Sequence, residues 1–178
     1  MHSDSLTQIS ASLDIPYALL EKDYKEYEKP LLEGFMSTDS YYEHLTIHFG
    51  KKVEGDLFYK YFVPFSVNKL MLSLVDNIRA KGGRCVIGSN TFAPHYPYLF
   101  SSKVSDHFDA YYASHLMHIS KPDKEFWTYI MDKEGYCSHD TLFIDDRKEN
   151  IEGALSVGID AFHYTSDEAL VERFKEYF

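Results

Sequence analysis

The sequence predicts an α/β protein in which a parallel sheet flanked by helices follows a separate group of helices. Two observations support this fold class. The first part of the chain shows helical patterns one after another, whereas the second part alternates short apolar runs with helical patterns. Short strands that are apolar throughout are typical of parallel sheets covered on both faces. The change occurs near Phe62-Val63-Pro64, so we expect a helical module over residues 1–62 and an α/β module over residues 63–178.

Composition indicates a globular chain. Of its 178 residues, 44% are hydrophobic and 26% are charged, which is enough apolar material for a core. The net charge of -10 argues against nucleic acid as a partner, because binding to phosphate backbones depends on cationic groups. Neither a basic, apolar signal segment nor a run of about 18 apolar residues is visible, so we expect no membrane association. Two cysteines make no disulfide framework, and together these features favour a cytoplasmic location.

Helix start and stop signals divide the first part of the chain. Residues 5–13 are predicted to form a short helix. Pro16 lies in the first turn of a second helix, which ends at Gly34, because proline suits the start of a helix and glycine its end. A third helix is predicted over about residues 39–49, and residues 54–62 are weakly helical.

The second part begins with a clear amphipathic helix. Apolar residues recur from Val67 to Ile78 at spacings of three and four, and Gly82-Gly83 ends the pattern. Ser166 is predicted to cap a terminal helix. The remaining elements are strands at 85–88, 109–112, 141–144 and 159–163 and helices at 122–133 and 149–157.

Polar side chains follow two of the predicted strands at the point where each strand ends. Ser89 and Asn90 follow the first strand, and Asp145 and Asp146 follow the third. Lys121 lies between these two segments in the sequence, directly before a helix. Ligands of open parallel sheets bind beyond the carboxyl ends of the strands, so we expect these five side chains to form one site.

The combination of these residue types favours binding of a phosphoryl group. Alone, a polar turn, an acidic helix cap or a lysine before a proline is common without any function. Two adjacent carboxylates repel each other and favour a bound cation, and oxygen ligands suit Mg²⁺. A hydroxyl, an amide and a lysine supply hydrogen bonds and positive charge to an oxyanion. Together they predict a site for a phosphoryl dianion held by Mg²⁺.

The order of the segments SNT, KPD and FIDDRKENIEGALSVGIDAFHY resembles the haloacid dehalogenase (HAD) superfamily of hydrolases, and most closely its phosphatase-like members with a helical cap. The resemblance extends over essentially the whole chain. It implies a Rossmann-like core, a parallel sheet flanked by helices, over residues 63–178 and an N-terminal helical cap over residues 1–62. It also implies a phosphorylated small molecule as substrate and Mg²⁺ as cofactor.

The resemblance assigns a role to each candidate residue. Ser89 matches the hydroxyl that donates a hydrogen bond to the transferring phosphoryl group, and Asn90 matches a neighbouring contact to substrate. Lys121 matches the lysine that steadies the negative charge of nucleophile and intermediate. Asp145 matches a metal-binding carboxylate, with Asp146 supporting the metal or its waters. The adjoining Asn150 is expected to tie this acidic loop to the next helix.

One part of the family pattern has no counterpart in this sequence. The family reaction begins with an aspartate nucleophile at the end of the first core strand, in an apolar run followed by DxD or DxG. Asp4 has no strand ahead of it, Asp14 follows a helix, and Asp145 is needed at the metal. We therefore expect a Mg²⁺-dependent phosphate-monoester phosphatase that is inactive or incomplete as written. Dehalogenation is less favoured, because the acidic pair indicates a bound metal and dehalogenation needs none.

Three explanations remain open at this point. The nucleophile strand is missing through a misplaced start or a truncation, or the chain is a non-catalytic relative that binds a phosphorylated ligand or a protein. Alternatively, another chain supplies the strand, or exposed sheet edges drive dimerisation, so a monomer or a homodimer is expected. A response-regulator receiver does not fit, because its acidic pair comes first in the chain. His44 and His48 are spaced as half of a zinc site, but a solvated helix face explains them better.

Overall fold

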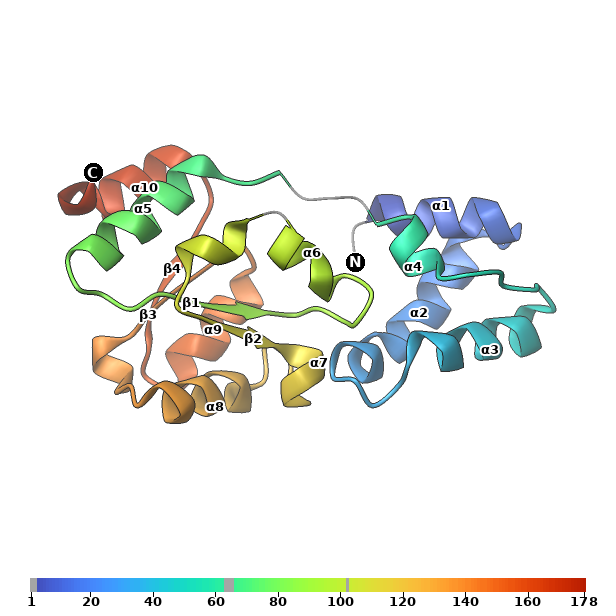
Figure 1. Cartoon of the computed structure of the whole chain (residues 1–178). Coiled ribbons are helices and arrows are strands. Elements are labelled where there is room, and N and C mark those ends of the chain that lie inside the picture. Colours follow the sequence, from blue (N-terminus) through green and yellow to red (C-terminus); the bar gives the residue numbers. More distant parts are fainter. Residues whose placement is uncertain (1–2, 63–65, 102) are drawn as a thin grey trace.

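The computed structural model describes residues 3–62, 66–101 and 103–178, which form two modules side by side (Figure 1). One module consists of helices only, and the other contains all four strands of the described residues. None of the described helices is long and apolar enough to cross a membrane. The boundary predicted at residues 62–64 falls partly on residues 63–65, which lie outside the described residues.

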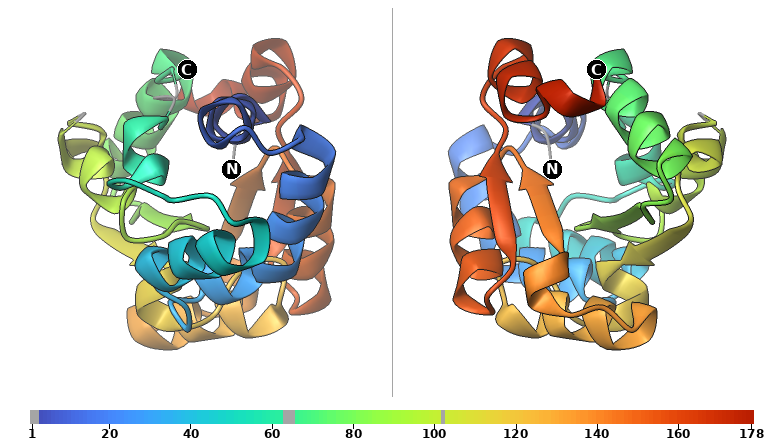
Figure 2. Two further views of the ribbon diagram at one scale, coloured as in Figure 1. Left: turned by 90° about the vertical axis from the view of Figure 1, so that its right-hand side faces the viewer. Right: turned by 90° about the vertical axis from the view of Figure 1, so that its left-hand side faces the viewer.

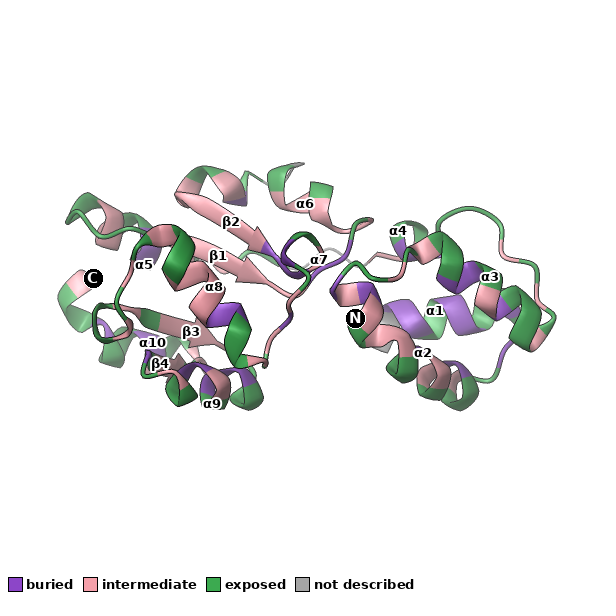
Figure 3. Ribbon diagram, turned by 90° about the horizontal axis from the view of Figure 1, so that it is seen from below, coloured by how far each residue is buried: buried purple, intermediate pink, exposed green. Residues whose placement is uncertain are grey.

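The helical module is held together by one apolar core. Buried residues line the inward side of its helices (Figure 3). Leu20, Leu45 and Phe58 are each at most 1% exposed. Ser37 caps the third helix by accepting a hydrogen bond from the backbone N–H of Ser40, as the preference of serine for this position favours. Its helices are α1 (Ser3–Leu13), α2 (Tyr17–Leu32), α3 (Thr38–Phe49) and α4 (Leu57–Lys60).

The α/β module alternates strands and helices in the order that the sequence predicts. The predicted amphipathic helix is α5, and each strand lies within one residue of its predicted bounds. Two short helices, α6 and α7, were not predicted. The elements are α5 (Lys69–Ala80), β1 (Val86–Ser89), α6 (Tyr96–Ser101), β2 (Ala110–Ala113), α7 (Ser114–Met117), α8 (Lys124–Glu134), β3 (Leu142–Asp145), α9 (Lys148–Ser156), β4 (Asp160–His163) and α10 (Asp167–Arg173), with 3₁₀ turns at Val104–His107, Ser138–Asp140 and Lys175–Tyr177.

The strands pair in parallel, as predicted, but as two separate pairs. β1 pairs with β2, placing Ser89 opposite Ala113, and β3 pairs with β4, placing Asp145 opposite His163. Within the described residues no strand joins β1 to β3, and Figure 2 shows the two pairs apart. Each pair therefore has an inner edge, on β1 and on β3, whose backbone groups have no strand partner.

Helices cover both faces of the strands. α8 and α9 form one layer with Phe126, Trp127 and Ala154 in its core, whereas α5 and α10 form the other around Leu74 and Leu170. Successive residues of β3 contact opposite layers, because side chains alternate along a strand: Phe143 belongs to the first cluster and Ile144 to the second. The α/β module is thus a three-layer arrangement, as the apolar strands predict.

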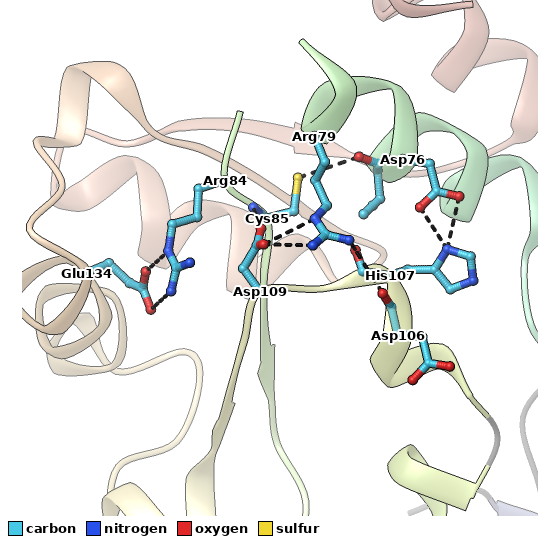
Figure 4. Close-up of polar contacts among 9 residues, drawn as sticks. Asp76, Arg79, Arg84, Cys85, Asp106, His107, Asp109 and Glu134 are labelled. Carbon is cyan, nitrogen blue, oxygen red and sulfur yellow. Dashed lines mark hydrogen bonds and ion pairs between the residues drawn. The ribbon is translucent and has the colours of Figure 1, made fainter. Parts of the chain in front are cut away.

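A charged network fastens α5 to the amino ends of β1 and β2 (Figure 4). The Asp109 carboxylate accepts hydrogen bonds from the Arg79 guanidinium at 2.8 and 3.2 Å and from the backbone N–H of Cys85 at 2.8 Å. The backbone N–H of Cys85 and the Arg79 side chain together hold the pKa of Asp109 below its usual value. The candidate site lies at the opposite, carboxyl ends of the strands.

Candidate active site

Lys121 connects the two strand pairs at their carboxyl ends. Its Nζ donates to the backbone carbonyl of Gly88 in β1 at 3.0 Å and to Oδ2 of Asp145 in β3 at 2.8 Å. The side chains of Lys121 and Asp145 are only 10% and 8% exposed. Two of the predicted site residues, Lys121 and Asp145, are thus brought together, and Ser89 follows directly after the Gly88 carbonyl that Lys121 contacts.

The environment of Asp145 favours its charged form. Burial alone raises the pKa of a carboxyl group, but here the charge and hydrogen bond of Lys121 oppose it, together with the backbone N–H of Arg147 and the side-chain amide of Asn150. The balance holds the pKa of Asp145 below its usual value. Asn150 is itself 4% exposed, so the acidic loop is tied to α9 through this hydrogen bond.

Ser89 and Asn90 occupy different kinds of position. Ser89 is the last residue of β1, so its hydroxyl lies on the strand and not in the loop after it. The side-chain amide of Asn90 makes two hydrogen bonds to the backbone of Lys121, both at 2.8 Å. Its Nδ2 donates to the Lys121 carbonyl, and its Oδ1 accepts from the Lys121 N–H. Asn90 therefore holds the lysine in place, and its predicted contact to substrate stays a prediction.

Asp146 lies at the rim of the site. Its side chain is exposed, and its backbone carbonyl is 3.0 Å from Nε2 of His163, the last residue of β4. Asp145 and Asp146 thus present one nearly buried and one exposed carboxylate. A cation held by both would keep contact with solvent.

Two of the carboxylates considered as nucleophile, Asp4 and Asp14, do not lie at strand ends. Asp4 belongs to α1. Asp14 has a positive φ of 52° after α1, and its exposed carboxylate pairs with Lys51 in the helical module. Of the four strands in the described residues, only β3 ends on carboxylates, and Asp145 is already paired with Lys121.

Glu33 is a site neighbour that the sequence analysis did not identify. It follows the last residue of α2, where the helical module meets the α/β module. Its carboxylate accepts hydrogen bonds from the hydroxyl and the backbone N–H of Ser120 at 2.8 and 3.2 Å. Only its place before Gly34, as an ordinary helix end, is visible in the sequence. The helical module thereby contacts the residue that precedes Lys121.

The other clusters of potential ligands are less organised. Cys137, His139 and Asp140 hold potential metal-ligand atoms within 4.8 Å of one another, but all three side chains are exposed on one turn. His44, which shares the spacing of a half zinc site with His48, lies 2.7 Å from a carboxylate oxygen of Asp23 and stacks on His48. Within the part of the chain that the structure describes, no hydrogen bond or ion pair joins either group to Lys121 or Asp145.

Comparison with known proteins places the chain in a family. The family model described as haloacid dehalogenase-like hydrolase matches residues 17–163, and the chain belongs to this family. The resemblance seen in the sequence is thus confirmed.

Solved structures agree in fold. A HAD-family enzyme of Bacteroides thetaiotaomicron superposes with a TM-score of 0.81 at 20% identity, covering 98% of this chain and 91% of the other. A HAD-like hydrolase of Porphyromonas gingivalis gives a TM-score of 0.79 at 19% identity, with 98% and 89% coverage. Among curated proteins, a sesquiterpene phosphatase of Aspergillus oryzae is 31% identical over 100 residues. That match covers 56% of this chain and 51% of the relative, about half its length.

Proposed function

We propose that the site at the carboxyl ends of β1 and β3 binds the phosphoryl group of a small phosphate monoester and belongs to a Mg²⁺-dependent phosphatase. The observation that carries this proposal is the nearly buried ammonium group of Lys121 between the Gly88 carbonyl and the Asp145 carboxylate. A cation held in place beside a strand-end hydroxyl provides preorganised stabilisation for an oxyanion.

Each residue contributes a defined interaction in this proposal. The Ser89 hydroxyl donates a hydrogen bond to a phosphoryl oxygen, and Lys121 balances the negative charge that the phosphoryl group brings. Asn90 fixes the Lys121 backbone through its two hydrogen bonds, and the Gly88 carbonyl and Asp145 hold the ammonium group, so little reorganisation is needed when the substrate binds.

The acidic loop fits a hard divalent cation. Asp145 accepts three hydrogen bonds, and a carboxylate offers about four acceptor sites, so one direction remains for a ligand. Asp146 adds an exposed carboxylate next to it. Oxygen ligands with room for water are what Mg²⁺ prefers. When bound, Mg²⁺ would neutralise charge on the phosphoryl oxygens and polarise the phosphorus centre.

The relatives support the same chemistry. Crystals of the Bacteroides thetaiotaomicron enzyme contain magnesium, and others contain magnesium with inorganic phosphate. The Aspergillus oryzae relative is a sesquiterpene phosphatase. These proteins support phosphate-monoester hydrolysis as the reaction class for this chain.

Turnover also requires an attacking carboxylate. Covalent phosphoryl transfer needs a nucleophile, and in the described residues the strand-end carboxylates are those of the acidic loop alone. We therefore propose that hydrolysis needs a further strand, seated against the inner edges of β1 and β3, that presents an aspartate to the site. The second candidate function follows from the same observation: a non-catalytic module that binds a phosphorylated ligand or a protein.

Calorimetric titration of the 178-residue protein with inorganic phosphate, with and without Mg²⁺, tests the site. We expect phosphate to bind in the presence of Mg²⁺ and binding to be lost in Lys121→Met and Asp145→Asn, whereas the exposed Lys124→Met variant behaves as wild type. Phosphate binding that is absent, or that is equal in all four proteins, would contradict the site.

Hydrolysis of an aryl phosphate separates the two candidate functions. Mg²⁺-dependent turnover that Asp145→Asn abolishes would rule out the non-catalytic module. If the protein binds phosphate without turning over ester, the in-frame codons ahead of Met1 decide: an apolar run ending in Asp-x-Asp or Asp-x-Gly supports the enzyme, and a stop codon directly upstream supports the binding module.

A further inference from the structure

A buried carboxylate lies where the helical module meets the candidate site. Glu33 follows α2 and is 8% exposed, although glutamate is rarely buried unless it is paired. Its Oε1 accepts from the Ser120 hydroxyl at 2.8 Å and from the Ser120 N–H at 3.2 Å. Lys29 lies one helical turn earlier, with its Nζ 3.8 Å from Oε1. Glu33 is therefore paired chiefly with a residue 87 positions away.

The backbone around Glu33 is fitted to the same segment. The Glu33 carbonyl lies 2.7 Å from Nδ1 of His118. Gly34 approaches the backbone so closely that a Cβ atom there would lie 2.5 Å from the His115 carbonyl oxygen, and its φ of +69° also favours glycine. The end of α2 thus holds the segment from His115 to Ser120 by side chain, backbone and close approach.

This segment leads directly into the site lysine. Ser120 is held by Glu33 from the helical module, and the next residue, Lys121, is held by Asn90 from the loop after β1. Two successive residues are therefore fixed from two different modules. The direction in which the Lys121 side chain leaves the backbone depends on both attachments.

From this arrangement we infer that Glu33 is a positioning residue that aligns the Lys121 ammonium group with Gly88 and Asp145 through Ser120. The inference rests on the proposed phosphoryl site and concerns the regulation of phosphate binding there. A displacement of the helical module relative to the strands would move Ser120 through its contact with Glu33, and with it the Lys121 side chain. The module that carries α1–α4 thereby sets the strength of phosphate binding, without any of its side chains needing to contact the phosphate.

A purely structural role for Glu33 makes a different prediction. The ion pair between Lys29 and Asp123, at 2.6 Å, also crosses the junction and is largely exposed. If Glu33 only strengthens the junction, its removal lowers the melting temperature and leaves the environment of Lys121 unchanged. If it positions the lysine, the Lys121 signals change even at temperatures where the protein stays folded.

Nuclear magnetic resonance of the Lys121 side-chain ammonium group distinguishes the two roles without any substrate. The signal is assigned by its loss in Lys121→Met. We expect Glu33→Ala to shift or broaden it, Glu33→Gln to keep it near the wild-type position because the oxygen acceptor remains, and Glu26→Ala, at an exposed site on α2, to leave it unchanged. An unchanged Lys121 signal in Glu33→Ala overturns the inference. If that variant does not fold, Ser120→Ala, which removes only the hydroxyl donor, takes its place.

Phosphate titration in the presence of Mg²⁺ gives the second readout. Binding to Glu33→Ala is expected to weaken about tenfold, the effect of a lost hydrogen bond to a charged group, while Glu33→Gln and Glu26→Ala bind like wild type. Failure of the wild-type protein to bind phosphate contradicts the proposed function alone, because the ammonium signal still decides the role of Glu33. Equal phosphate affinity in Glu33→Ala and wild type contradicts the positioning role.

Discussion

The ammonium nitrogen of Lys121 and the Oδ2 atom of Asp145 lie 2.8 Å apart, and this ion pair spans the region between the two strand pairs. Lys121 precedes α8 and also contacts β1, whereas Asp145 ends β3. Because both side chains are nearly buried, the pair gains little against the cost of desolvation, but each member depends strongly on the other.

Replacing Lys121 by methionine should therefore destabilise the protein by about 3–5 kcal/mol, since Asp145 would keep a buried charge without its cation. Urea denaturation at neutral pH measures the loss. The double variant Lys121→Met/Asp145→Asn should recover part of it, because the uncompensated charge is removed with the lysine. If the single variant loses less than about 1 kcal/mol of stability, as is usual for exposed ion pairs, the Lys121–Asp145 pair is solvated and not buried.

The Asp109 network predicts how stability depends on pH at a place remote from the site. The pKa of Asp109 is lowered in the folded protein, so its contribution to stability is fully present above the unfolded-state value of about 3.9 and is lost as pH falls through the folded pKa. Asp109→Asn should cost about 1.5–3 kcal/mol at neutral pH, the range for hydrogen bonds to a charged group.

The measurement is the free energy of unfolding of both proteins between about pH 3 and pH 7, a window that spans the unfolded-state pKa. The difference between wild type and Asp109→Asn should shrink on acidification below about pH 4, because protonation removes the charge from wild type as well. Asp106→Asn is a suitable control, since Arg79 contacts the carbonyl of that residue and not its carboxylate. A difference that is constant across this range would mean that Asp109 has an ordinary pKa.

Local patterns were sufficient to predict most of the fold. The spacing from Val67 to Ile78 identified α5, and apolar runs bounded by glycine and polar residues identified the four strands to within one residue. The rule that ligands bind at the carboxyl ends of parallel strands predicted the place of Asp145, because it depends only on strand direction. Lys121 lies in the turn before α8 and was assigned to the site by its charge, and its ammonium group lies 2.8 Å from Asp145.

The contacts that escaped the sequence analysis are long-range or lack a period. Glu33 and Ser120 are 87 residues apart, and neither residue type signals a burial partner by itself. α6 contains Pro97 and spans six residues, which is too short for a helical repeat to be visible. The division of the strands into two pairs is what a missing nucleophile strand leads us to expect, but which strands pair depends on tertiary contacts that apolar runs alone do not determine.

The core of the helical module predicts a sharp contrast between two leucines. Leu45 in α3 is 0% exposed, whereas Leu19 in α2 is 53% exposed. Leu45→Ala should cost about 2–5 kcal/mol because it removes buried methyl groups and leaves a cavity, while Leu19→Ala should change stability by less than about 0.5 kcal/mol. Thermal and urea unfolding of the two variants test this, and similar losses at both positions would contradict the burial of Leu45 in the core of the helical module.

Replacing Gly153 by alanine should change the stability of the protein in the direction opposite to that expected from helix propensity. It lies inside α9, where alanine normally stabilises a helix by about 1 kcal/mol relative to glycine. A Cβ atom at this position would overlap the Trp127 ring and lie 2.7 Å from the backbone carbonyl of Pro122. Gly153→Ala should therefore destabilise the protein by about 1–3 kcal/mol through overpacking.

Gly153→Ala is expected to destabilise the protein because α9 packs against the start of α8 without space for a side chain. This contact lies directly after the turn that carries Lys121. Leu155→Ala, at a 53% exposed position of the same helix, serves as the control and should change stability by less than about 0.5 kcal/mol. Trp127→Phe combined with Gly153→Ala should recover only part of the loss, since the smaller ring relieves the contact with Trp127 but not the one with the Pro122 carbonyl. Stabilisation by Gly153→Ala alone would show that α8 and α9 are not in close contact. The packing of α9 against Pro122, the residue after Lys121, would then be looser than the structure shows.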